Sequence, residues 1–98
     1  MVSHIMLIRM APDMASAAKR VWEQALLPTL QAEPGFVAAR LLISADAPSE
    51  GMHFCIWETQ GAADAALRSS AVLQEMQQLT AHLSEPPTIR SYDLVSES

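Results

Sequence analysis

Three side chains that could do chemistry stand at alternate positions of the segment HFCIWE, namely His53, Cys55 and Trp57. Successive side chains of a β-strand point to opposite faces, so a strand here would place all three on one face. An imidazole with an ordinary pKa near ~6.5 can take up a proton at neutral pH, and an indole can stack on a flat aromatic molecule. His53 is therefore the candidate catalytic base, and Trp57 is a candidate wall of a substrate pocket.

Each of these residues also has a structural interpretation. His53 follows a predicted hairpin and is compatible with a half-exposed strand end, whereas Trp57 is compatible with a core anchor. An apolar strand cysteine such as Cys55 is usually a small buried hydrophobe. We expect His4 to lie at a solvated strand end. Trp22 is expected to pack beside the apolar stripe of the first predicted helix, and shaping the mouth of the pocket is its alternative role.

A second pair of candidates, Arg90 and Tyr92, lies near the C-terminus in the segment TIRSYDLV. The alternate spacing places both on one face of the last predicted strand. Recognition of a substrate hydroxyl or anion is one role for them, and a barrel rim or dimer contact is the alternative. We include both as candidate pocket residues.

The elements that must position these side chains follow from apolar periodicity and turn formers. Strands are predicted over 2–10, 36–44, 52–58 and 88–95, and helices over 14–31 and 61–68, with a restart at Ser69 or Ser70. Asp13 and Thr59 are expected to cap the helices, and Pro28 is expected to kink or break the first one. The order strand, helix, strand, strand, helix, strand is that of an α+β, ferredoxin-like βαββαβ fold with a four-stranded antiparallel sheet. Residues 1–98 are predicted to form a single domain.

Both faces of this predicted sheet are apolar. In the second strand Phe36, Ala38 and Leu42 are expected to point one way, and Val37, Ala39, Leu41 and Ile43 the other. The helices of such a fold cover one face only, so the other face would be an exposed apolar patch on a monomer. We therefore expect a homodimer that presses sheet against sheet.

Composition excludes several classes of protein. The formal net charge is −5 with the single lysine Lys19, so no basic stripe is present for nucleic acid or for an anionic membrane surface. The single cysteine excludes an intrachain disulfide, and the three histidines lack the spacing of a metal motif, so no metal site is predicted. The N-terminal segment MVSHIMLIRM lacks the features of a signal peptide, which favours a cytoplasmic protein.

The segments PGFVAARLL, FCIWETQGAADAALRSS and PPTIRSYDLV resemble, in this order and with suitable gaps, the antibiotic biosynthesis monooxygenase (ABM) domain family. The similarity covers nearly the whole chain, and its most specific elements are Pro34-Gly35-Phe36, Trp57-Glu58 and the strand from Pro87 to Tyr92. The resemblance implies a dimeric α/β barrel with a pocket between sheet and helices. It also implies oxidation of quinols or polycyclic anthrones by O₂, often without metal or flavin, so no cofactor is expected.

The functional residues of two branches of that family carry over only in part. The haem-degrading branch uses an asparagine on the first strand, and the chain contains no asparagine. The tryptophan and histidine that the branch needs on the second helix fall on Ala66 and Met76, so haem degradation is rejected. The anthrone-oxidising branch has an asparagine where this chain has His53 and a tyrosine where it has Ala63.

The leading hypothesis is a cofactor-independent monooxygenase-like enzyme that acts with O₂ on a quinol or a polycyclic phenolic compound, a hydrophobic aromatic small molecule. Two alternatives stay open because a fold does not determine a function. One is a non-catalytic dimeric module that binds a small molecule. The other is an isomerase or cyclase on the same fold.

Overall fold

The computed structural model describes residues 1–97 of the chain. Its strands are β1 (Val2–Arg9), β2 (Phe36–Ile43), β3 (Glu50–Trp57) and β4 (Thr88–Asp93). Its helices are α1 (Ala15–Val21), α2 (Leu27–Gln31), α3 (Gln60–Arg68) and α4 (Ser70–Thr80), and the π-helical segment η1 (Trp22–Leu26) joins α1 to α2. The last residue of the predicted domain 1–98 lies outside the described residues.

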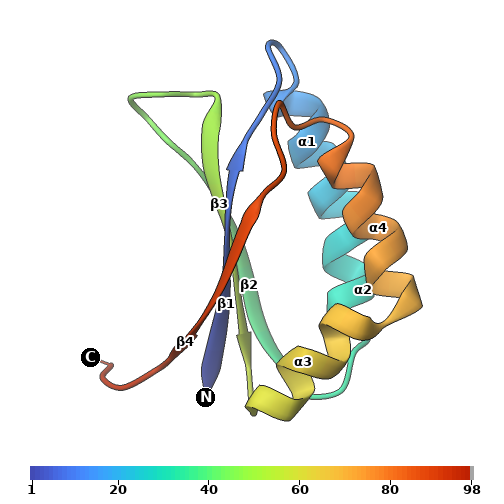
Figure 1. The fold of residues 1–98 in the computed structure, drawn as a ribbon, viewed down its shortest axis with the longest axis vertical. Coiled ribbons are helices and arrows are strands. Elements are labelled where there is room, and N and C mark those ends of the chain that lie inside the picture. Colours follow the sequence, from blue (N-terminus) through green and yellow to red (C-terminus); the bar gives the residue numbers. More distant parts are fainter. Residues whose placement is uncertain (98) are drawn as a thin grey trace.

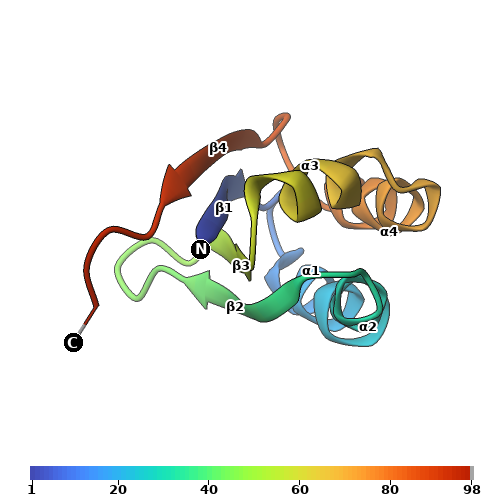
Figure 2. The same cartoon turned by 90° about the horizontal axis from the view of Figure 1, so that it is seen from below.

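The four strands form one antiparallel sheet in the order β2-β3-β1-β4. All helices lie on one face of this sheet (Figure 1). Viewed from below, α1 and α2 lie beside α3 and α4 over that face (Figure 2). The arrangement confirms the predicted α+β, ferredoxin-like fold. No helix in residues 1–97 has the length and apolar character needed to cross a membrane.

The register of the two central strands fixes which side chains face the helices. His4 of β1 lies opposite Cys55 of β3, and Met6 lies opposite His53. Residues directly opposite one another in an antiparallel pair project from the same face of the sheet. His4, Met6, His53 and Cys55 are all buried, so this shared face is the one that the helices cover.

Strand β2 departs from the predicted alternation because its pairing with β3 contains an irregularity between Phe36 and Ala38. A bulge adds one unpaired residue, so the side chains on its two sides change their relation to the faces. Phe36 pairs with Trp57 and Ala39 pairs with Cys55, which puts both on the helix-covered face. The prediction that grouped Phe36 with Ala38 and Leu42 was wrong for this reason.

The first helical region begins and bends differently from the prediction. Met14 occupies the cap position of α1 without a side-chain cap bond, and Asp13 has a left-handed φ of 63°. Asp13 is therefore a turn residue and not the predicted cap. The irregularity expected at Pro28 lies earlier, in η1, where Leu27 N–H donates to the carbonyl of Trp22. This i→i+5 bond widens the helix directly before the proline, which has no N–H to give.

The second helical region follows the prediction closely. The Thr59 hydroxyl accepts a hydrogen bond from Ala62 N–H at 3.1 Å and so caps α3. The Ser69 hydroxyl accepts from Val72 N–H at 3.4 Å and caps α4, which confirms the predicted restart. Leu83 lies beyond the end of α4, and its backbone forms an isolated bridge with Met10.

Candidate functional site

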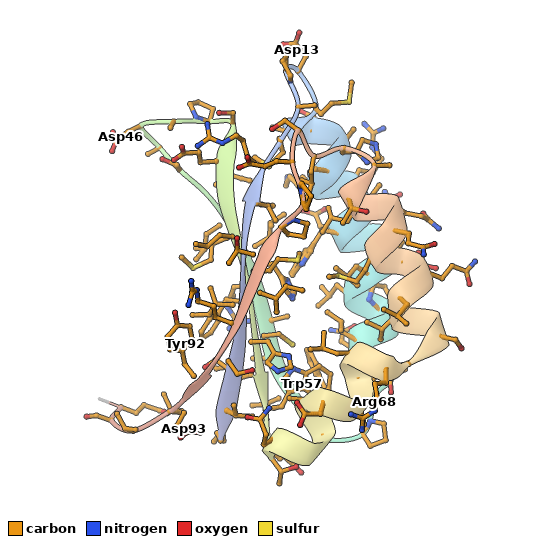
Figure 3. All side chains as sticks on the ribbon, viewed as in Figure 1. Asp13, Asp46, Trp57, Arg68, Tyr92 and Asp93 are labelled. Atoms are coloured by element: carbon orange, nitrogen blue, oxygen red, sulfur yellow. The ribbon has the colours of Figure 1, made fainter. Side chains whose placement is uncertain are left out.

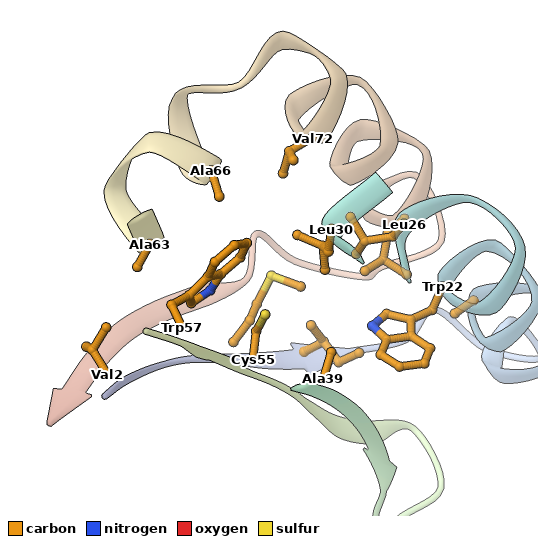
Figure 4. Close-up of a cluster of buried hydrophobic side chains, with 14 of the residues drawn as sticks. Val2, Trp22, Leu26, Leu30, Ala39, Cys55, Trp57, Ala63, Ala66 and Val72 are labelled. Atoms are coloured by element: carbon orange, nitrogen blue, oxygen red, sulfur yellow. The ribbon is translucent and has the colours of Figure 1, made fainter. Parts of the chain in front are cut away.

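The side chains of His53, Cys55 and Trp57 lie on the helix-covered face of β3. Their exposed fractions are 6%, 1% and 1%. The half-exposed strand end that was an alternative for His53 is therefore not what the structure shows. Trp57 extends from β3 toward Ala63 and Ala66 of α3 (Figure 4).

A small cavity lies between this face and the helices. Residues from β1, β3 and β4 and from α2, α3 and α4 line its wall: His4, Met6, Leu30, His53, Cys55, Trp57, Ala66, Leu67, Val72, Met76 and Ile89. Its volume is about 20 Å³, which is room for a single water molecule. Ile89 is 43% exposed although it lines the cavity, so the cavity approaches the surface beside β4.

One hydrogen bond sets the protonation pattern of His53. The indole Nε1–H of Trp22 donates to Nδ1 of His53 at 2.8 Å, and the bond is buried. An indole nitrogen can only donate, so Nδ1 is the acceptor and the ring proton of the neutral imidazole is on Nε2. Burial, and after it the charge of His4, lower the pKa of His53 to about 4. His53 is therefore a neutral hydrogen-bond donor at pH 7.

His4 is a member of the same site, against the expectation of a solvated strand end. It is 5% exposed and lines the cavity across the strand pair from Cys55. Burial lowers the pKa of His4, and the carboxylate of Asp64 on α3 opposes that shift. Nε2 of His4 is buried and has no hydrogen-bond partner among residues 1–97.

The indole nitrogen of Trp57 is the second buried polar atom that lacks a partner in the described part of the chain. The ring itself is held tightly, because Phe36 packs edge-to-face against it with ring centroids 5.8 Å apart. A buried donor without a partner costs about 1–3 kcal/mol, so an acceptor oxygen placed in the cavity would offset that cost. The arrangement is suited to bind an oxygen-bearing group.

Cys55 has a structural role in this arrangement. Burial raises the pKa of its thiol to about 12. The thiolate is the reactive form of cysteine, and it is essentially absent at neutral pH at such a value. Cys55 therefore contributes an apolar wall to the cavity.

Arg90 and Tyr92 lie elsewhere, which corrects their placement in the pocket. Arg90 pairs with Ile5 and Tyr92 pairs with Ser3, and these residues alternate with the inward-facing His4. Both side chains therefore project from the face of the sheet that the helices leave uncovered. Figure 3 shows Tyr92 and Trp57 on opposite sides of the sheet. The residue of β4 that does line the cavity is Ile89, opposite Met6.

No group of three His, Cys, Asp or Glu side chains that could hold a metal ion is present in residues 1–97. His82 lies past the end of α4, where its Nδ1 is 3.0 Å from the carbonyl oxygen of Gln78. Met76 and Ala66, the positions at which a haem-degrading relative would carry its functional side chains, are uncharged residues in the cavity wall.

Two residues of the candidate site, His4 and Trp22, were not among the site residues predicted from the sequence, although signals for both were present. His4 alternates with the apolar Met6, which is typical of an inward-facing strand position. Trp22 lies four residues from both Ala18 and Leu26, which is the spacing of one helix face. The bond between Trp22 and His53 joins residues 31 positions apart, and no local pattern predicts it.

A four-stranded antiparallel sheet with helices on one face and a small, largely apolar cavity between the two layers defines an α+β protein of ferredoxin-like fold. The chain belongs to the antibiotic biosynthesis monooxygenase family, whose model matches residues 1–78. This match confirms the resemblance drawn from the sequence. A search of the curated proteins finds no significant match.

Solved structures share the fold at low sequence identity. Rv0793 from Mycobacterium tuberculosis is 26% identical with a TM-score of 0.80, over 99% of this chain and 97% of its own. A putative antibiotic biosynthesis monooxygenase from Bordetella bronchiseptica is 21% identical with a TM-score of 0.86, over 97% of each chain. SnoaB, a cofactor-independent oxygenase from Streptomyces nogalater, is 17% identical with a TM-score of 0.86, over 98% of this chain and 94% of its own.

Proposed function

We propose that the protein is a cofactor-independent monooxygenase that acts with O₂ on a quinol or a polycyclic phenolic compound. Membership of the family supports the reaction class. The common fold with SnoaB, which is described as a cofactor-independent oxygenase, supports chemistry without a cofactor.

The observation that carries the proposal is the pair of buried ring nitrogens, Nε1 of Trp57 and Nε2 of His4, on side chains that line one cavity. Neither nitrogen has a partner within the described residues. The neutral imidazole of His53 lines the same cavity. A phenolic oxygen entering this space would find the indole of Trp57 and the neutral imidazole of His53 as donors for the negative charge that develops on it, with the unpartnered Nε2 of His4 nearby, and preorganised donors are a large contribution to catalysis.

The reaction balances without a separate reductant. A phenol or anthrone that loses a proton becomes an anion rich enough in electrons to reduce O₂. One oxygen atom is then added to the substrate carbon as a carbonyl oxygen. The other leaves as water with two hydrogens. In an anthrone both come from this carbon, and in a phenol or quinol one comes from the carbon and one from the phenolic O–H. The substrate itself supplies all the electrons.

The cavity must enlarge to admit such a substrate, because about 20 Å³ is far below the ~300 Å³ or more of a typical ligand pocket. The residues toward α3, α4 and β4 are Leu67, Met76 and Ile89. They are flexible aliphatic side chains, and methionine adapts to irregular shapes especially well. Movement of these side chains would open the cavity beside β4, where Ile89 already reaches the surface.

Oxygen uptake in the presence of a panel of quinols and anthrones tests the proposal. We expect uptake with the wild-type protein, and a loss of about 100-fold in kcat for His53→Phe, because one oxyanion donor typically contributes about 10²–10³-fold. The matched control is Phe54→Leu on the same strand, whose side chain faces the opposite side of the sheet. Equal rates in wild type and His53→Phe would remove His53 from the mechanism, and no uptake with any compound would contradict the reaction.

A second function, a non-catalytic module that binds a hydrophobic small molecule after the same enlargement, is supported by the mainly apolar side chains that line the cavity. This function requires binding but no turnover. Quenching of the fluorescence of Trp57 by an aromatic ligand, without consumption of oxygen, would distinguish it from the enzyme.

We also propose that two copies pair through the uncovered face of the sheet. Leu42, Met52 and Leu7 form a cross-strand row on this face. Leu42 and Leu7 are 52% and 48% exposed, although exposed apolar surface is costly. A second copy would cover the row by two-fold symmetry.

The homodimer predicts that Leu7→Glu raises the dimer dissociation constant by at least about 100-fold, because an unpaired charge buried in an interface costs roughly 3–5 kcal/mol. Analytical ultracentrifugation at micromolar concentration measures this change. Leu73→Glu is the matched control, because Leu73 is 47% exposed and lies on α4, away from the sheet. A monomeric wild-type protein, or equal dissociation of both variants, would contradict the pairing.

A further inference from the structure

The acceptor nitrogen of His53 is already occupied, which bears on how the substrate loses its proton. Nδ1 accepts the indole hydrogen of Trp22 at 2.8 Å, so Nε2 carries the ring proton. A further proton could enter only at Nδ1, and it would break this buried bond. His53 is therefore built to donate a hydrogen bond toward the cavity and not to accept a proton from it.

His4 differs from His53 in two respects that suit a proton acceptor. Its Nε2 is buried on the cavity wall and no residue within 1–97 bonds to it, so its lone pair is available in the tautomer protonated at Nδ1. Burial lowers the pKa of His4, but the carboxylate of Asp64 on α3 favours the protonated form and partly offsets that shift, whereas the charged neighbour of His53 is His4, which adds to the lowering of the pKa of His53 by burial.

The other titratable groups around His4 do not change this difference between the charged neighbours of His4 and those of His53. Cys55, directly opposite on β3, is kept protonated because burial raises its pKa to about 12. Ser91, directly opposite on β4, does not titrate in this range. Asp64 is fixed on α3 by a hydrogen bond of 2.7 Å from the Gln60 amide. The same wall carries His53, which is neutral at pH 7, and uncharged residues such as Leu30, Val72 and Met76, while Asp93 at the end of β4 is exposed.

We propose that His4 is the catalytic base and that Asp64 stabilises the imidazolium that His4 becomes. The inference rests on the proposed oxygenase function. In the step, the phenolic O–H bond, or in an anthrone a C–H bond of the CH₂ carbon, breaks. Its electron pair stays on the substrate, whose oxygen carries the negative charge, and the proton forms an N–H bond at Nε2 of His4. Trp57 and His53 donate hydrogen bonds to the resulting anion. After O₂ has reacted with the anion, His4 returns the proton to the oxygen atom that leaves, and the substrate carbon loses the second hydrogen of that water as its C=O bond forms.

An anaerobic titration with 1,8-dihydroxy-9-anthrone separates proton removal from oxidation, because the anion absorbs at longer wavelength than the neutral anthrone. We expect the wild-type protein at pH 7 to ionise the bound anthrone, and His4→Gln to reduce the ionised fraction at least tenfold. Asp64→Asn is expected to reduce this fraction several-fold and to lower the pKa of His4 in an NMR titration. Asp46→Asn is the charge-matched control, because Asp46 is exposed in the loop between β2 and β3. Thermal unfolding of His4→Gln checks that the variant is folded.

The possible results distinguish a failure of His4 as the base from a failure of the proposed oxygenase function. Full ionisation in folded His4→Gln, or a larger ionised fraction in Trp22→Phe, whose His53 would have a free acceptor, would overturn His4 as the base and leave the oxygenase untouched. Ionisation that depends on His4, followed by no oxygen consumption in air, would overturn the oxygenase and retain the base. A wild-type protein that binds the anthrone without ionising it would overturn the inference about His4.

Discussion

Lowering the pH from 7 to 4 is expected to reduce the free energy of unfolding by about 3 kcal/mol through His53 alone, since each unit of pKa difference between the folded and unfolded states corresponds to about 1.36 kcal/mol. The pKa of His53 is lowered from 6.5 to about 4 in the folded protein. Between these two values the unfolded chain binds a proton that the folded chain does not. Stability is therefore complete above pH 6.5, falls as the pH decreases toward about 4, and stops falling below that value for this residue.

The physical cause of the effect is the buried bond with Trp22. Protonation places a charge in the core and removes the lone pair that accepts the indole hydrogen. His4 adds a contribution of the same sign, because burial also lowers its pKa.

Urea denaturation between pH 4 and pH 7.5, at one fixed protein concentration, measures this effect. His53→Gln is the matched variant, because its amide oxygen can still accept from Trp22 but does not titrate. We expect the stability of this variant to vary less with pH by about 3 kcal/mol over the window. Parallel curves for the two proteins would show that His53 has an ordinary pKa and is not buried as a neutral ring.

Replacing Gly35 by alanine is expected to destabilise the fold by about 2–6 kcal/mol, a large share of the ~5–15 kcal/mol typical of a domain. Two costs add. Gly35 has a φ of +81°, a left-handed conformation that costs a residue with a Cβ about 1–3 kcal/mol. A Cβ built there would also lie 2.5 Å from Cβ of Ala62 on α3, and overpacking typically costs about 1–3 kcal/mol.

The position matters because it connects β2 to the start of α3. The carbonyl of Gly35 accepts a hydrogen bond of 2.8 Å from Glu58 N–H. Movement to relieve the clash would disturb this bond and with it the strand end that carries Trp57.

A double-mutant cycle separates the two costs, with the free energy of unfolding as the readout. Ala62→Gly removes the partner of the clash, so the Gly35→Ala/Ala62→Gly pair should recover part of the loss and leave the cost of the backbone conformation. Gly61→Ala is the control, because a Cβ there meets only the Thr59 hydroxyl, at 3.9 Å. Equal effects of alanine at positions 35 and 61 would contradict the close approach.

The fold was predictable because local signals agreed with one another. Thr59 and Ser69 are helix caps by type and position, and alternation in HFCIWE places His53, Cys55 and Trp57 on one face. The two predictions that were wrong, the faces of β2 and the cap at Asp13, failed because each depends on how segments far apart in the sequence meet. The bulge between Phe36 and Ala38 depends on how β2 meets β3, and the left-handed conformation of Asp13 depends on the path between β1 and α1.

The candidate site was predictable in part. His53 and Trp57 were placed in one interior, but Arg90 and Tyr92 were assigned to it although their strand presents them to the other face. A strand seen alone has two equivalent faces, and only the register with β1 shows which face the helices cover. The same register was needed to bring His4 into the site, opposite Cys55.

The number of residues in the π-helical segment η1 determines which way the side chains before and after it point. Ala18, Trp22, Leu26 and Leu30 are all buried and repeat every four residues. In a uniform α-helix each residue turns about 100°, so such a series would rotate steadily away from the core. The wider turn of Trp22–Leu26 takes up the surplus rotation and keeps the series in line. Shortening this segment by one residue would leave a helix that satisfies its backbone, but it could not direct Trp22 to His53 and Leu30 to the cavity at once.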